Sequence, residues 1–175
     1  MYNVGDNIVY GMGGVMTIVD IRRESFTDEE KDYLLLRDYG RGDSSVTYVP
    51  MDNEKLMGCM HPLLTREEVM EAISLAKELP DVKWIPDSRA RGEAYKDIMR
   101  EANRAKILAM IRTIHHIGLA REAIGKKNFL ADENVMLKAE GIILLEFSIV
   151  LGISEAEVRE IIHREVKGAG AHENT

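Results

Sequence analysis

Residues 65–79, TREEVMEAISLAKEL, mark the point at which the chain changes from one kind of secondary structure to another. Thr65 and Glu68 have the spacing of a capping box, in which the Thr hydroxyl accepts from a first-turn backbone N–H and Glu reaches back to the cap residue. Pro80 follows the helical pattern and cannot continue it. We therefore predict a helix that begins after Thr65 and ends at about Leu79.

The residues before this helix contain short apolar runs that are typical of β-strands. Glycine-rich or acidic segments separate these runs, and connections this short favour antiparallel neighbours. The predicted strands cover residues 7–10, 15–21, 33–36 and 46–50. The first 60 residues are therefore expected to form a small antiparallel β-barrel or curled sheet.

The residues after this helix are predicted to be helical throughout. Asp87 or Ser88 caps a helix that runs to about His116, and Ser154 opens a second capping box. The remaining helices are expected at about residues 132–151 and 154–166. The predicted fold class is α+β with two domains, residues 1–60 and residues 61–175, the second being all-α.

The apolar run at residues 141–152, GIILLEFSIVLG, is predicted to be a buried helix and not a membrane span. Glu146 lies at its centre, and the run is shorter than the roughly 18 residues that a span needs. The chain starts without the basic and apolar pattern of a signal peptide, and its single Cys59 excludes an intrachain disulfide. We expect a cytoplasmic protein without a membrane partner.

Charge is distributed unevenly along the 175 residues, which carry 23 Lys and Arg against 30 Asp and Glu. Residues 83–127 hold 11 basic and 5 acidic residues inside an otherwise acidic chain. At helical spacing, four of the cations form one stripe: Arg89, Lys96, Arg100 and Arg104. The stripe is interpreted either as a solvated face paired with Glu93 and Asp97, or as a row of contacts to DNA phosphates.

Trp84, the only tryptophan, lies in the predicted connection between two helices. One interpretation places its ring in the core or over a helix junction, which is common for tryptophan. The other makes it an exposed wedge beside the basic helix, where an aromatic ring presses into a DNA base step. The sequence leaves both alternatives open.

Motifs that would indicate catalysis, a metal site or a cofactor site are missing from the sequence. It has no C-x-x-C, H-E-x-x-H, G-x-S-x-G or P-loop pattern. His115 and His116 are adjacent, so on a helix they point in different directions and do not chelate one metal together. We predict a protein that is not an enzyme, with no cofactor; a small enzyme with a site between the domains is the less favoured alternative.

The N-terminal half resembles a known family through Val4-Gly5-Asp6, Val9-Tyr10, the strand at residues 31–36 and the strand at residues 46–50. These residues are similar to the RNA-polymerase-interacting domain of the CarD/CdnL family of transcriptional regulators. That domain is a Tudor/SH3-like β-barrel, which also occurs in the transcription-repair coupling factor. The segment KWIPDSRAR at residues 83–91, followed by Tyr95-Lys96, is similar to the opening of that family's helical DNA-contacting domain.

The resemblance implies a bacterial transcription regulator that binds the RNA polymerase β subunit and stabilises the promoter open complex. Trp84 would enter the minor groove at the upstream edge of the melted region, largely without sequence preference. Arg89, Arg91, Tyr95 and Lys96 would contact the DNA backbone, and helical geometry extends this set to Arg100 and Arg104. A monomer is favoured.

The barrel departs from the family pattern on the strands that face the polymerase. Basic residues are common there in the family, whereas the corresponding positions of this chain are Glu24 and Tyr48. The candidate polymerase-binding residues are Arg23, Glu24, Val46, Tyr48 and Pro50. An alternative function is a protein-protein interaction module without DNA contact, whose helical domain dimerises through residues 142–151.

Overall fold

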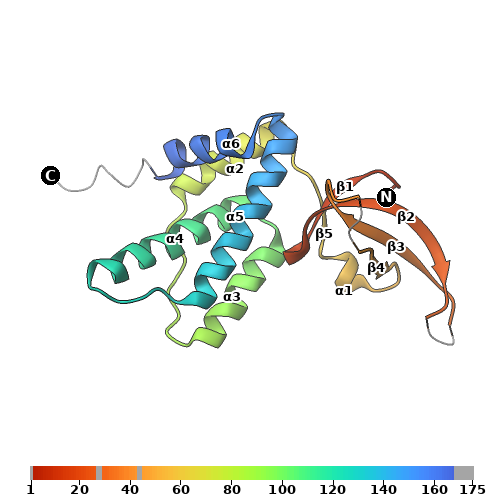
Figure 1. Cartoon of the computed structure of the whole chain (residues 1–175), viewed down its shortest axis with the longest axis horizontal. Helices are drawn as coiled ribbons and strands as arrows, with labels where there is room; N and C mark the ends of the chain where they lie inside the picture. Colours follow the sequence, from red (N-terminus) through yellow and green to blue (C-terminus); the bar gives the residue numbers. More distant parts are fainter. Residues whose placement is uncertain (1, 27–28, 43–44, 168–175) are drawn as a thin grey trace. The chain divides into compact units, whose positions relative to one another are not determined.

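The computed structural model describes residues 2–26, 29–42 and 45–167 (Figure 1). The chain forms two compact units, Met1–Leu63 and Leu64–Thr175. The predicted division after residue 60 would cut through the last strand of the sheet, at Met60–Pro62.

Unit 1 is a five-stranded antiparallel sheet, which confirms the predicted β part of the α+β fold. Its strands lie in the order β4-β3-β2-β1-β5. Their bounds are β1 Asn7–Tyr10, β2 Gly14–Glu24, β3 Lys31–Asp38, β4 Thr47–Pro50 and β5 Met60–Pro62. A 3-10 helix, Gly11–Gly13, joins β1 to β2, and the short helix α1, Glu54–Met57, lies between β4 and β5.

Neither α1 nor β5 is predicted from the sequence. β5 has only three residues and ends in Pro62, so it is too short for an alternating pattern to be visible. Tertiary contacts establish it as a strand: it pairs with β1, and the Tyr2 hydroxyl donates to the Met60 carbonyl oxygen at 2.8 Å. A three-residue strand of this kind is stable only because neighbouring segments supply its hydrogen-bond partners.

The sheet buries one face and leaves part of the other exposed. The period of two along β3 and β4 places Leu34, Leu36 and Val49 in the core with Ile8 and Ile18. Tyr33 and Tyr48, which neighbour these core residues in sequence, point to the opposite face. There they contact Phe26 edge to face, with ring centroids 5.2 and 5.1 Å from that of Phe26.

Unit 2 is a bundle of helices, as predicted. Its helices are α2 Arg66–Glu78, α3 Ser88–Glu101, α4 Arg104–Ala123, α5 Leu130–Leu151 and α6 Glu155–Ile162, followed by a π-helical turn, His163–Lys167. α4 packs against α2 and α5, while α3 and α6 pack against α5. Both predicted capping boxes are confirmed, Thr65 with Glu68 and Ser154 with Glu157.

The single helix predicted from residue 87 to residue 116 is wrong, because the chain turns at Ala102. Ala102 has a positive φ of 51°, in the left-handed region that ends a helix. The Asn103 side chain then accepts from the Lys106 backbone N–H at 3.1 Å and caps α4. Arg104 therefore begins a new helix and does not continue the stripe of α3.

The carboxylate of Glu146, at the centre of the apolar helix α5, is tolerated because it is paired. Its side chain is fully buried, and Arg104 donates to both of its oxygens, at 2.9 and 2.8 Å. A buried carboxylate needs such a paired and hydrogen-bonded partner. The prediction of a buried helix is confirmed, and none of the described helices has the length and hydropathy needed to cross a membrane.

Candidate nucleic-acid interface

Trp84 lies at the middle of the connector, residues 79–87, which joins α2 to α3. Its side chain is half-buried, which excludes a ring sealed in the core and agrees with a ring that covers a helix junction. The indole packs against Phe129 at the start of α5, with ring centroids 5.5 Å apart. Part of the ring is thus fixed by the bundle while part remains accessible to solvent.

Arg91 on α3 supports the indole from inside unit 2. Its guanidinium carbon lies 4.0 Å from the centroid of the Trp84 ring and 4.8 Å from that of Phe129. The same guanidinium donates from Nη1 to the carbonyl oxygens of Ile85 and Pro86, at 2.7 and 3.2 Å. Arg91 therefore holds both the ring and the backbone that follows it, through cation–π contact and hydrogen bonds.

The charge of Arg91 is balanced inside the bundle. Its Nε donates to both carboxylate oxygens of Asp132, at 3.1 and 2.9 Å, and only 1% of the Arg91 surface is exposed. Asp132 lies in the first turn of α5, where the helix dipole also favours a negative charge. Burial, followed by the nearby Asp132 carboxylate, raises the pKa of Tyr95 to about 12, while Arg91 opposes the shift.

Three of the predicted DNA contacts need correction. Arg91, Tyr95 and Arg104 are 1%, 2% and 6% exposed. Both arginines are ion-paired with buried carboxylates, so leaving those partners for a phosphate would strand a charge in the interior. These three residues lie beneath the surface and are not part of it.

The exposed cations of α3 are Arg89, Lys96 and Arg100. Lys96 is 2.7 Å from Glu93, and Arg100 pairs with Asp97 and, at 3.7 Å, with Glu93. The hydrogen bond from Lys96 lowers the pKa of Glu93 below its usual range. Lys96 and Arg100 are thus exposed and paired with carboxylates, as the first interpretation of the stripe expected.

A second group of cations, which is not among the predicted site residues, lies near Trp84. The Arg121 guanidinium carbon is 3.9 Å from the Phe129 ring centroid, and its Nε donates to the Lys127 carbonyl oxygen at 2.9 Å. Lys126 and Lys127 are exposed in the turn between α4 and α5. In the sequence, the only sign of this second group was the excess of basic residues over residues 83–127. Only the contact between Trp84 and Phe129 shows that this turn lies next to the indole.

The candidate polymerase-binding residues lie in unit 1, on β2 and on or beside β4. Tyr48 contacts Phe26, and Phe26 is 61% exposed. Arg23 of β2 pairs with Glu30 at 3.4 Å. Glu24, at the end of β2, is opposite Lys31 of β3. Val46 precedes β4 and Pro50 ends it opposite Tyr33, both half-buried. The aromatic cluster Phe26, Tyr33 and Tyr48 contains only one predicted residue.

Residues 2–63 match the CarD-like/TRCF RID domain family, over the span that forms the five-stranded sheet. Unit 1 is a CarD-like/TRCF RID domain. The predicted resemblance is therefore confirmed for residues 2–63, while that of residues 83–96 stays a prediction; the RID domain is a non-catalytic, RNA-polymerase-interacting domain. No curated protein matches the chain.

The RID domain has β4 at one edge of its sheet. Among the described residues β4 pairs only with β3. In the aromatic cluster, Tyr48 is on β4, Tyr33 is on the neighbouring β3, and Phe26 follows β2. The RID match ends at Leu63, and the helical unit with Trp84 lies outside it.

We predict that Asp132→Ala lowers the free energy of unfolding by about 3–5 kcal/mol, because it leaves the Arg91 charge buried without a partner. Asp97→Ala is the matched control: Asp97 is exposed and its loss should change stability by less than about 0.5 kcal/mol. Unfolding followed by Trp84 fluorescence measures both variants. Equal stabilities for the two variants would contradict the role assigned to the Arg91–Asp132 pair.

Proposed function

We propose that this protein is a bacterial transcription regulator that binds the RNA polymerase β subunit through its RID domain and stabilises the promoter open complex through Trp84. The proposed contact with DNA is based on one observation, the half-buried Trp84 indole that packs against Arg91 and Phe129. The polymerase part is supported by the RID match over residues 2–63.

A supported indole favours melted over closed DNA for an energetic reason. Opening a base step in intact duplex costs a few kcal/mol, whereas the junction at the edge of a melted region has already lost stacking on one side. The indole therefore binds the open state more tightly, and only such a difference in binding shifts the equilibrium between the states. A ring fixed in advance by Arg91 and Phe129 also loses little conformational freedom on binding.

The proposed phosphate contacts are the exposed cations on the two sides of Trp84. Lys83 and Arg89 lie on the connector and the first turns of α3, and Lys126 and Lys127 lie on the turn that Arg121 and Phe129 link to the indole. Lys96 and Arg100 join them only if phosphates replace their present carboxylate partners. Cations on two sides of a wedge position it on the backbone without reading sequence.

The RID domain is proposed to bind the β subunit through the β4 edge and the aromatic cluster. Strand addition at an exposed edge uses main-chain hydrogen bonds, so it tolerates differences in side chains such as Glu24 and Tyr48. The exposed rings add apolar area next to that edge. Tethering to polymerase raises the local concentration of a DNA-binding surface that is weak by itself.

The alternative is an interaction module without DNA contact, which was expected to dimerise through residues 142–151. Ile142, Ile143, Phe147 and Leu151 on residues 142–151 are buried within the helical unit itself. Covering them with a second copy would require the bundle to open.

Trp84→Ala should shorten the lifetime of the open complex about tenfold, which corresponds to the loss of about 1.4 kcal/mol of preference for melted DNA. Binding to polymerase should not change, because Trp84 lies outside the RID domain. Trp84→Phe, which keeps an aromatic ring, should shorten the lifetime less. A lifetime equal to wild type in a folded Trp84→Ala protein would refute the wedge.

Affinity of the full chain for a forked promoter duplex should fall roughly 100-fold between about 50 and 200 mM salt if Lys83, Arg89, Lys126 and Lys127 each meet a phosphate. Replacing Lys126 and Lys127 together by Ala should reduce the slope of log affinity against log salt by about two. Lys138→Ala is the control, since Lys138 is an exposed lysine further along α5. An unchanged slope in the double variant would remove the α4–α5 turn from the interface.

Tyr48→Ala should weaken binding to a polymerase β fragment by about tenfold or more, because exposed aromatic anchors dominate such interfaces. Tyr39→Ala is the matched control. Tyr39 is also exposed, and it follows the C-terminal end of β3, whereas Tyr33 of the aromatic cluster lies near the start of β3. Titration of the full chain against the fragment measures both. Equal losses for the two variants would place the polymerase surface elsewhere on the RID domain.

A further inference from the structure

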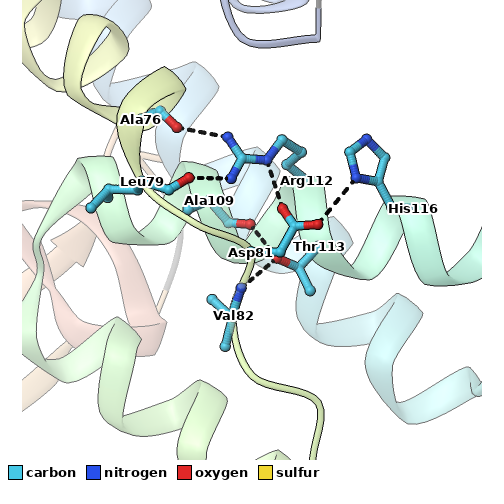
Figure 2. Close-up of polar contacts among 8 residues, drawn as sticks. All are labelled: Ala76, Leu79, Asp81, Val82, Ala109, Arg112, Thr113 and His116. Atoms are coloured by element: carbon cyan, nitrogen blue, oxygen red, sulfur yellow. Dashed lines mark hydrogen bonds and ion pairs between the residues drawn. The ribbon is translucent and has the colours of Figure 1, made fainter. Parts of the chain in front are cut away.

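Arg112 of α4 holds the chain where α2 ends and the connector begins (Figure 2). Its Nη1 donates to the Ala76 carbonyl oxygen at 2.7 Å and its Nη2 to that of Leu79 at 2.6 Å. Its Nε donates to the Asp81 carboxylate at 2.9 Å. Carbonyl groups in the last turn of a helix lack partners within the helix, and one guanidinium supplies them here together with the first charged residue of the connector.

Thr113, the next residue of α4, fixes the connector one residue further on. Its hydroxyl oxygen accepts from the Val82 backbone N–H at 2.8 Å, and the hydroxyl donates to the Ala109 carbonyl oxygen at 2.8 Å. The Thr113 side chain is buried, so its rotamer is set by packing and by both hydrogen bonds. Figure 2 shows the side chains of Arg112 and Thr113 directed at successive parts of the same segment.

Charge on Asp81 strengthens this attachment. Burial alone would raise the pKa of Asp81, but hydrogen bonds from Arg112 and His116 outweigh it and lower the pKa below its usual range. Asp81 is therefore ionised at neutral pH, with His116 Nδ1 at 3.5 Å from its second oxygen. The Asp81 side chain is half exposed, so the geometry of Arg112 and Thr113 is the firmer part of the contact.

Trp84 lies between this attachment and the one made by Arg91. Val82 is held by α4, Ile85 and Pro86 are held by α3, and the indole leaves the chain between them. A segment fixed this closely on both sides of one residue has few backbone conformations left. The direction of the Trp84 side chain thus depends on α4 as well as on α3.

We infer that Arg112 and Thr113 are positioning residues for Trp84: by fixing the start of the connector on α4, they set the orientation in which the indole meets melted DNA. The DNA part of this inference rests on the proposed function. The structural part, that α4 holds the indole in place, does not depend on it.

Thr113→Val tests the inference with little change in shape, because it removes the hydroxyl that accepts from Val82. Trp84 is the only tryptophan, so its fluorescence anisotropy and its quenching by acrylamide report the indole directly. We expect quenching to rise and the open-complex lifetime to shorten about 2- to 10-fold, the range that one net hydrogen bond supplies. Thr113→Ser keeps the hydroxyl and should behave as wild type.

Arg112→Lys provides a second variant if Thr113→Val does not fold, since one ammonium group cannot make the three contacts of the guanidinium fork. Circular dichroism and Tm establish that each variant is folded. The double variant Trp84→Ala, Thr113→Val should have the same lifetime as Trp84→Ala alone, because the positioning effect requires the indole.

The outcomes separate the inference from the proposed function. Unchanged Trp84 quenching in a folded Thr113→Val or Arg112→Lys protein would overturn the inference, and so would further shortening in the double variant. If Trp84→Ala leaves the lifetime unchanged, the wedge fails, and the fluorescence of the single variants still decides whether α4 positions the indole. Raised quenching with a normal lifetime, where Trp84→Ala is defective, would overturn the DNA part.

Discussion

The buried ion pair between Arg91 and Asp132 is the contact on which the arrangement around Trp84 depends. It joins α3 to the first turn of α5, and the same guanidinium contacts the Trp84 and Phe129 rings and two carbonyl groups of the connector. A buried charge without its partner is costly, so each member of the pair fixes the other. The position of the indole is therefore specified by the interior of the bundle.

Two kinds of cation within residues 83–127 have different roles. Arg91 and Arg104 are buried, and each balances a carboxylate on α5. Lys83, Arg89, Lys126 and Lys127 lie outside these buried pairs, where a polyanion can reach them. A count of basic residues does not separate these roles, because burial and pairing arise only when α3, α4 and α5 come together.

The RID domain and the helical unit divide the proposed function between them. The RID domain provides a polymerase-interacting sheet with β4 at one edge and two exposed rings, Phe26 and Tyr48. The helical unit provides a supported aromatic residue with exposed cations in the connector, in α3 and in the α4–α5 turn. Under the proposed function, a modest preference for melted DNA is sufficient because binding to polymerase supplies the local concentration.

Sequence alone determined the change from strands to helices, both capping boxes, the buried helix around Glu146 and the RID resemblance, because these depend on local spacing and short motifs. It did not predict the turn at Ala102, since alanine rarely adopts a positive φ, nor β5, whose partner is supplied by β1. Only the tertiary structure decided which cations face solvent and placed Phe129 and the α4–α5 turn beside Trp84. These depend on contacts between residues far apart in the chain, which no local pattern records.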